Sequence, residues 1–263
     1  MKLRFIIVAF LPYSLAHAEP RYTQSDFGGV GLLQTPTARM APAGEISLNA
    51  NRTDPYSRYS LSLQPLDWLE GTFRYTAISN RKYGSEALSG SQSYKDKAVD
   101  VKVRLWQESH WLPEVAFGFL DVGGTGLFSS EYFVANKRYK DLDFSLGIAW
   151  GYLGNRGDFS NPMNILGGDY NDRRDVNSPG DVNTNTYFKG SPSLFGGISY
   201  QTPWAPLSLK LEYEGNDYKH EPQNNNQIQD SPINIGAVYK LSDSVDLSVG
   251  WERGNTALFG ITL

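Results

Sequence analysis

The stretch DFGGVGLLQTPTARM, residues 26–40, places three glycines within four positions, at Gly28, Gly29 and Gly31. Glycine-rich turns of this kind cradle phosphate groups when a strand precedes them, Gly-Lys-Ser/Thr follows and a helix begins there. None of these features surrounds this stretch in the sequence. We therefore expect neither a nucleotide site nor any other cofactor.

Hydrolytic chemistry would need a histidine beside a serine or a carboxylate. Beyond residue 18, histidine occurs at positions 110 and 220. His110 lies in a predicted turn, whereas His220 lies between Asp217 and Glu221 in a predicted loop. A solvated loop histidine is the better explanation of His220, so no catalytic residue is predicted. A hydrolase that uses His220 at the rim of a barrel stays an alternative.

Acidic and amide side chains are frequent in the segment 153–192, which raises the question of a calcium site. The twelve-residue ligand pattern with a closing glutamate is absent from it. A hydrated surface loop is the simpler interpretation, and no metal site is expected.

Charged side chains recur at alternate positions in segments whose other positions are apolar. Such alternation places the charges on one face of a strand and the apolar side chains on the other. In a closed barrel the charged face lines the interior, either as a filling of ion pairs or as a conducting path. We expect the cations of this set to pair with its anions. The candidate lumen residues are Arg74, Asp100, Lys102, Arg104, Lys210, Glu212, Asp246 and Glu252.

Period-two alternation runs through most of the chain, and no segment shows sustained helical spacing. The alternation predicts about twelve strands. Their predicted ranges are 44–52, 57–64, 69–78, 96–107, 114–121, 127–138, 142–152, 193–201, 207–216, 232–240, 244–253 and 257–263.

The predicted connections fall into two alternating sets. One set consists of short turns, whereas the other includes the long polar segments 79–95, 153–192 and 217–231. Three connections of the second set, 53–56, 122–126 and 254–256, are short as well. Short periplasmic turns and long extracellular loops are typical of an outer-membrane barrel. The predicted fold is therefore all-β: a transmembrane antiparallel up-and-down barrel of about twelve strands.

Aromatic residues lie near both ends of the predicted strands, as in the belts that mark the two membrane–water boundaries. One predicted belt has Tyr75, Trp150, Tyr213 and Trp251 at the long-loop end, and the other has Tyr200 and Tyr239 at the short-turn end. Outer-membrane lipid is the partner that these belts predict.

The first eighteen residues have the pattern of a cleaved secretory signal peptide, 1–18. Lys2 and Arg4 precede an apolar run, and Ala16 and Ala18 provide the small residues before the cleavage site. Removal of this segment changes the formal charge from −4 to −6, which gives no electrostatic basis for binding nucleic acid. The chain has no cysteine and hence no disulfide framework.

The segment 19–43 lies between the signal and the barrel, 44–263. Its glycines suit tight turns of the backbone, and the residue before Pro36 avoids helix. We expect this segment at the periplasmic mouth of the barrel or inside the lumen as a small plug.

Three stretches resemble the YjbH/GfcD-like exopolysaccharide proteins of the Gram-negative outer membrane. DFGGVGLLQTPTARMAPAGE, residues 26–45, is similar to the N-terminal signature of that family. GGTGLFSSEYFVANKRY, residues 123–139, resembles a second signature, with glycines at Gly123, Gly124 and Gly126. WERGNTALFGITL, residues 251–263, is similar to the stretch that closes the first barrel of the family.

The resemblance implies a non-enzymatic outer-membrane barrel that aids exopolysaccharide or capsule secretion, with the secretion proteins as partners. Family members usually continue beyond this point, so the resemblance implies an N-terminal part of a usual member. The final alternation of Phe259, Ile261 and Leu263 resembles a strand that the outer-membrane assembly machinery recognises. If glycan passes or docks, the lumen charges are its candidate contacts.

Three alternatives to a scaffold or conduit for glycan stay open. One is the barrel hydrolase or surface protease described above. Another is a passive porin, which conductance across a planar bilayer would reveal. The last is a truncated, non-functional remnant of a longer gene.

Overall fold

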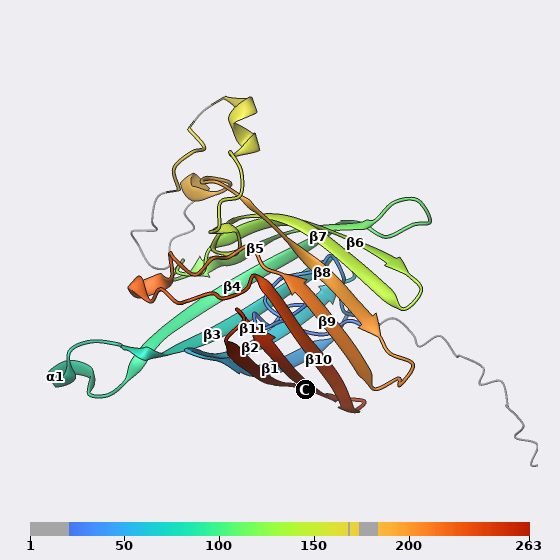
Figure 1. Cartoon of the computed structure of the whole chain (residues 1–263), viewed down its shortest axis with the longest axis horizontal. Coiled ribbons are helices and arrows are strands. Elements are labelled where there is room, and N and C mark those ends of the chain that lie inside the picture. The colour runs from blue at the N-terminus through green and yellow to red at the C-terminus, as the bar shows by residue number, and fades with distance from the viewer. Residues whose placement is uncertain (1–20, 168, 174–183) are drawn as a thin grey trace, which may run out of the picture.

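The computed structural model describes residues 21–167, 169–173 and 184–263, so the predicted signal peptide lies outside the described residues. The described chain forms twelve strands joined antiparallel into a closed barrel (Figure 1). The strands are β1 (Ile46–Thr53), β2 (Tyr56–Leu66), β3 (Leu69–Lys82), β4 (Ser93–Trp106), β5 (Glu114–Gly124), β6 (Ser130–Tyr139), β7 (Leu142–Gly151), β8 (Ser193–Gln201), β9 (Leu207–Tyr213), β10 (Ile233–Ser242), β11 (Val245–Glu252) and β12 (Thr256–Thr262).

Each strand pairs with its neighbours in sequence, and β1 closes the barrel by pairing with β12. Up-and-down order places short turns such as 67–68 and 140–141 at one end, here called the turn end. The opposite end carries the long connections 83–92, 152–192 and 214–232 and is here called the loop end. The predicted number of strands and their order are confirmed.

The outer wall is apolar and the inner wall is polar, as the alternation predicts. In β2 the outward-facing Tyr59, Leu61 and Leu63 are exposed, whereas Arg58 and Ser60 are buried inside. Exposed apolar side chains recur around the outside of the barrel, from Ile46 in β1 to Phe259 in β12. A continuous apolar band of this kind is the surface that a membrane-spanning barrel presents to lipid.

At the loop end, β3, β4 and β5 extend farther than the alternation of apolar residues predicts. β3 continues to Lys82 and β4 begins at Ser93, so much of the predicted loop 79–95 is a hairpin that projects from the loop end. The short helix α1 (Glu86–Ser89) lies at the tip of that hairpin. The correction has a simple cause: the projecting part has little apolar alternation, although its backbone continues the ladder.

Helices in the described residues are short, and none is long and apolar enough to cross a membrane. Besides α1 they are single turns within loop-end connections. These turns are η1 (Tyr152–Gly154), η2 (Pro162–Leu166), η3 (Thr184–Thr186) and η4 (Pro222–Asn224).

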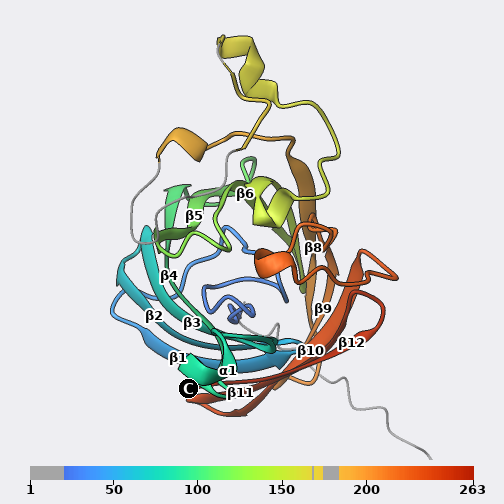
Figure 2. The ribbon, with the colours of Figure 1, turned by 90° about the vertical axis from the view of Figure 1, so that its left-hand side faces the viewer.

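The hydrophobic core of the described chain lies inside the barrel. It joins Phe27 and Ala38 of the N-terminal segment with Tyr132 and Phe195 of the wall. About eight strands give a barrel that wall side chains alone can fill, so a twelve-stranded barrel leaves a lumen that is open unless other material occupies it. Figure 2 shows that the N-terminal segment, drawn in blue, occupies the space within the ring of strands.

Candidate functional site

Residues 21–43, here called the plug, enter the lumen from the turn end and return to it. Two isolated bridges, between Gln24 and Val30 and between Gly31 and Pro36, fold the plug on itself. Near its tip, Phe27 packs against Tyr152 beside the loop end, with the ring centroids 6.0 Å apart. Most plug residues between positions 23 and 38 are buried. The lumen is thus occupied by the protein's own chain.

The carboxylate of Glu212 in β9 holds the second half of the plug by its backbone. It accepts hydrogen bonds from the backbone N–H groups of Leu33 at 2.9 Å, Gln34 at 3.0 Å and Thr35 at 2.9 Å. The hydroxyl of Thr35 also donates to Glu212, at 2.8 Å. Each buried N–H left without an acceptor costs about 1–3 kcal/mol, so removal of this carboxylate would leave a large deficit.

Lys210, two positions earlier in β9, binds the plug through acceptors instead of donors. Its ammonium group donates to the backbone carbonyls of Gly31 at 3.0 Å and Leu32 at 2.6 Å. Lys210 and Glu212 are consecutive inward-facing residues of β9. Lys210 therefore binds carbonyl groups of the plug backbone, and Glu212 binds N–H groups of the same backbone.

Across the lumen, Lys102 of β4 and Glu70 of β3 form a second pair of contacts with the plug. Lys102 donates to the carbonyls of Val30 at 3.0 Å and Arg39 at 2.9 Å, and it lies 3.1 Å from Glu70. Glu70 in turn accepts the N–H of Val30 at 3.1 Å. Glu70 and Lys102 are direct partners in the β3–β4 ladder, which explains why they pair.

Arg39 fixes the end of the plug beside the turn end. Its guanidinium contacts the carboxylates of Glu108 at 2.6 Å, Glu114 at 2.6 Å and Asp143 at 2.8 Å. Burial disfavours the charged form of Arg39, but Asp143 and Glu108 outweigh it, so the pKa of Arg39 is raised. Charge-assisted contacts of this kind are among the stronger polar interactions in proteins.

The tip of the plug lies between two buried arginines. The guanidinium groups of Arg58 and Arg74 lie over the ring of Phe27, at 4.6 and 4.7 Å from its centroid. The neighbouring Asp26 contacts Arg58 at 3.2 Å. Burial raises the pKa of Asp26 to about 6, although the attraction of Arg58 acts in the opposite direction.

Gly28 and Gly29 of the first motif lie where the plug backbone touches the wall. A Cβ at Gly28 would lie 2.0 Å from Oγ of Ser60, and one at Gly29 would lie 2.6 Å from Oε1 of Glu70. Gly28 also has a φ of +94°, which favours glycine. The motif therefore serves close packing in the lumen.

The second glycine motif forms an inward turn that covers the plug from the loop end. Gly126 has a φ of +75°, and the N–H of Phe128 donates to Asp121 at 3.0 Å. This turn buries Phe128 fully, edge-on to Tyr56 with 5.7 Å between ring centroids. In the same motif, a Cβ at Gly124 would lie 2.1 Å from the carbonyl oxygen of Lys97, whereas one at Gly123 would make only an ordinary contact, 3.9 Å from Cβ of Val99.

The loop 214–232 also folds inward and closes the same end. Glu221 is buried and accepts hydrogen bonds from the hydroxyls of Tyr56 and Tyr152 and from the amide of Asn216. Burial raises the pKa of Glu221, and these hydrogen bonds lower it by less. The predicted long, polar loop is thus partly an inner cap.

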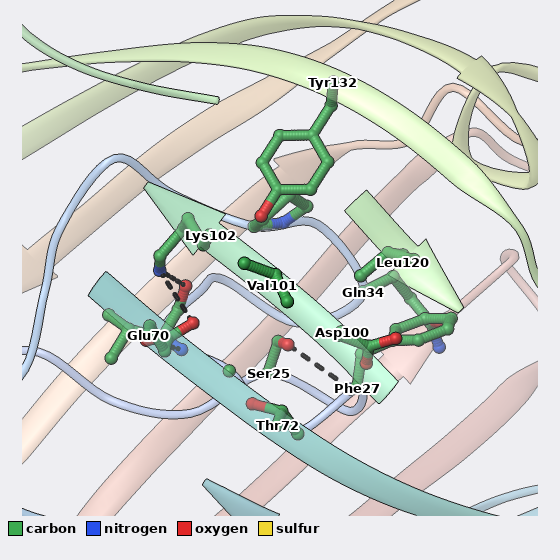
Figure 3. A pocket seen from close by; sticks show the side chains of 13 residues that line it. Ser25, Phe27, Gln34, Glu70, Thr72, Asp100, Val101, Lys102, Leu120 and Tyr132 are labelled. Carbon is green, nitrogen blue, oxygen red and sulfur yellow. Dashed lines mark hydrogen bonds and ion pairs between the residues drawn. The ribbon is translucent and has the colours of Figure 1, made fainter. Parts of the chain in front are cut away.

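A small cavity remains between the plug and the wall of β3, β4 and β5 (Figure 3). Its lining includes Phe27, Gln34, Lys102 and Tyr132, and its volume is about 20 Å³. That volume is roughly the space of one water molecule. The pairing of Lys102 with Glu70 is visible at its edge.

All eight candidate lumen residues project inward, but their pairing differs from the prediction except for Arg74 with Asp100, at 3.1 Å. Arg104 pairs with Glu114 at 3.4 Å, and Asp246 pairs with Arg21. Lys102, Lys210 and Glu212 bind the plug, as described above, and Glu252 accepts a hydrogen bond from the plug residue Gln34. Lys210, Glu212, Asp246 and Glu252 depart from the prediction because the plug is their partner, whereas Arg104 and Lys102 pair with the wall residues Glu114 and Glu70, which the candidate set did not include.

Three inward-facing residues that contact the plug or its partners are absent from the predicted set of lumen residues. Arg58, Glu70 and Glu114 contact the plug or its neighbours, and each lies in a predicted strand. Strict alternation identifies two of them. Arg58 precedes the outward-facing Tyr59, and Glu70 lies between the outward-facing Leu69 and Gly71.

The predicted aromatic belts need one correction. Tyr75, Tyr200 and Tyr239 are half-buried on the outer face, and Tyr213 and Trp251 are exposed there. Trp150 belongs to the same face of β7 but is only 2% exposed, because Phe188 of the loop 152–192 covers its ring.

Both histidines of the described residues lie at the surface. His220 is exposed, and His110 is exposed beside Trp111 at the turn end. Within the described residues, no group of three or more acidic, histidine or cysteine side chains is arranged to hold a metal ion.

Comparison with known families decides the assignment. Residues 23–263 match the model of the YjbH family, described as "Exopolysaccharide biosynthesis protein YbjH". The chain belongs to the YjbH family. Its sequence is also 53% identical, over 243 residues, to the "Uncharacterized lipoprotein YjbH" of Escherichia coli strain K12. That alignment covers 92% of this chain and 35% of the relative, so the chain spans about a third of the relative's length.

Solved structures similar to this member of the family include two porins. One is the KdgM porin in complex with disordered oligogalacturonate, with a TM-score of 0.43 and 12% identity over 82% of this chain and 96% of the porin. The other is the NanC porin, with a TM-score of 0.42 and 10% identity over 83% of this chain and 98% of the porin.

Proposed function

We propose that this protein is an outer-membrane barrel that assists exopolysaccharide biosynthesis and secretion as a scaffold for the secretion complex. The observation that carries the proposal is the family match over residues 23–263. The continuous apolar band on the outside of the barrel supports insertion in a membrane. The turn end would then face the periplasm and the loop end the cell exterior, as in barrels with short periplasmic turns.

A scaffold fits the interior better than an open conduit does. Glu70, Lys102, Lys210 and Glu212, which would face a passing glycan, already bind the plug. At the loop end, Phe128 and Glu221 lie buried above the tip of the plug. In this arrangement glycan and partner proteins contact the two rims and the exposed loops.

The proposed role needs no catalytic residue. His220 is exposed, and its neighbour Glu221 is engaged by Tyr56 and Asn216 instead. We expect His220→Ala to leave secretion unchanged, and loss of secretion in this variant would favour the rim hydrolase.

Gene deletion and complementation in the source bacterium test the proposal, with surface polysaccharide as the readout and the membrane fraction probed for the protein. We expect less surface polysaccharide on deletion and recovery with the unmodified gene. Unchanged polysaccharide on deletion would overturn the role in secretion.

A covalent lock on the plug separates the scaffold from the conduit. Ala38→Cys with Asn136→Cys joins positions already linked by a 2.8 Å hydrogen bond from the Ala38 N–H, in a chain without other cysteines. Disulfide formation is checked by the mass of the unreduced protein, and the two single-cysteine variants are the controls. If the protein is a scaffold, cells with the locked plug secrete polysaccharide normally. If it is a conduit that must release its plug, the lock stops secretion.

A further inference from the structure

The loop 152–192 begins inside the barrel, where Tyr152 and Leu153 are buried, but its segment around η2 projects sideways from the wall. Its described parts are 152–167, 169–173 and 184–192. In Figures 1 and 2 the segment with η2, drawn in yellow, stands outside the ring of strands beside β5, β6 and β7. By contrast, the hairpin of β3 and β4 projects from the loop end along the barrel.

An ion pair on the outer wall holds this loop in place. Glu131 of β6 faces outward yet is fully buried, because Arg173 covers it with two contacts, of 2.7 and 2.9 Å. Arg173 also donates to Oγ of Ser129 at 2.9 Å, and the N–H of Phe188 donates to Glu131 at 2.8 Å. A carboxylate on the outside of a membrane barrel is costly unless it is paired in this way.

Aromatic stacking extends the same attachment along the wall. The ring of Phe188 stacks on the outward-facing Phe117 and Phe133, with centroids 5.9 and 6.1 Å apart, and meets Trp150 edge-on at 5.3 Å. Tyr187 lies 5.0 Å from Phe119. These contacts explain why Trp150 is covered.

Asn161 connects this attached part to the segment 159–167, here called the overhang. Its side-chain amide donates to the carbonyls of Tyr170 at 2.9 Å, Phe188 at 2.6 Å and Gly190 at 2.9 Å. Asn161 is buried, and its oxygen accepts the N–H of Met163 at the start of η2. Asn161 therefore ties the overhang to Phe188, which lies on the wall.

The overhang has an apolar surface that the described chain leaves open. Its sequence, FSNPMNILG, contains no charged residue. Ile165 is 89% exposed, Leu166 73% and Phe159 37%. We propose that the overhang lies in the lipid leaflet on the loop side and anchors the loop 152–192 to the membrane surface.

The position and the composition of the overhang favour lipid as the partner that covers its apolar surface. Material beside the wall of a membrane barrel, at the end of its apolar band, is in contact with the interfacial region of the bilayer. Uncharged segments with exposed aliphatic side chains partition into that region. The tip of the β3–β4 hairpin differs on both counts. Leu88 is equally exposed, but it lies in α1, at the tip of a hairpin that projects along the barrel, beside the ion pair of Lys82 and Glu86. The proposal depends on membrane insertion alone and not on the role in secretion.

Spin labels test the proposal, since the chain has no cysteine to interfere. The full chain carries a nitroxide on Ile165→Cys or, as the matched control, on Leu88→Cys, in phosphatidylethanolamine–phosphatidylglycerol vesicles. Both positions are fully exposed, so neither label disturbs the core. Collision rates with oxygen, which concentrates in lipid, are compared with those of a water-soluble nickel chelate. We expect the oxygen-to-nickel ratio to be several-fold higher at 165 than at 88.

Equal ratios at the two positions would overturn the proposal, because they place the overhang in water. A label at 165 shielded from both reagents would also overturn it, since that indicates a protein contact. A second variant, Glu131→Gln in the chain labelled at 165, tests the attachment. We expect its ratio to fall towards that of position 88, and an unchanged ratio would refute the role of the ion pair.

Discussion

At the scale of single residues, the wall recognises the plug mainly through its backbone. Glu212 accepts three consecutive N–H groups, while Lys210 and Lys102 donate to carbonyls that precede them, and Lys102 also donates to the carbonyl of Arg39, which follows them. Plug side chains then fit the space that small wall residues leave. Leu33 lies over Gly236, where an added Cβ would come within 2.6 Å of its Cδ2.

The close approach of Gly28 to the wall leads to a prediction with a matched control. Gly28 and Gly44 have φ values of +94° and +90°, but a Cβ at Gly44 meets nothing within 4 Å. Both alanine substitutions cost about 1–3 kcal/mol of backbone strain. Gly28→Ala is expected to cost a further 1–3 kcal/mol or so from overpacking against Ser60. Urea unfolding in micelles measures both, and equal losses would contradict the packing shown here.

Asp26 provides a prediction on pH. Burial raises its pKa to about 6, so the folded protein takes up this proton at a higher pH than the unfolded chain does. The contribution of Asp26 to stability is therefore complete below about pH 4 and is lost as pH rises through 6. Arg58, Glu212 and Lys210 are the charged groups that bear on it. Carbon-13 NMR of the Asp26 carboxyl is expected to show a midpoint near 6.

Asp26→Asn supplies the control for that titration. It removes the proton but keeps an acceptor for Thr53 and Gln34, whose side chains lie 2.9 and 3.1 Å from the carboxylate. The variant is expected to show a flatter dependence of the unfolding free energy on pH between about 4 and 6. A carboxyl midpoint near 4 would refute the burial argument.

At the scale of elements, the wall was predictable and the loop-end connections were not. Period-two alternation identified twelve strands because alternate side chains of each strand face lipid on the outside and polar groups on the inside. The same rule stopped short in β3 and β4, where both faces are in water beyond the rim. It also missed that Phe188 covers Trp150, since contacts between a loop and a wall leave no periodic signal.

The tip of the β3–β4 hairpin is expected to be dispensable for folding. No residue of α1 is buried, and the N–H of Tyr83 donates to the carbonyl of Gln92 at 2.9 Å. Replacing residues 84–91 by Asn-Gly supplies a two-residue turn suited to that pair. We expect the melting temperature to stay within a few degrees, because exposed changes usually alter stability by about 0.5 kcal/mol or less. Failure of this variant to form a heat-resistant barrel would contradict the expectation.

At the scale of the whole molecule, the position of the plug leads to a prediction on conductance. It fills the lumen from Thr23 to Ala38 and is held by both halves of the wall. The intact protein is expected to show little steady conductance in a planar bilayer. A variant without residues 21–40 is expected to conduct, because twelve strands enclose more space than their side chains fill. Equal conductance of the two proteins would show that the plug does not close the lumen.

The sequence by itself determined the class of the barrel, its strand order and the inward direction of the charged residues. These follow from local alternation, which each strand expresses independently of the others. It also marked both glycine motifs, but it assigned no contact to them. Only the tertiary structure decided which groups pair. Glu212 and Leu33 lie 179 positions apart in the chain, and their contact exists only once β9 and the plug share one lumen.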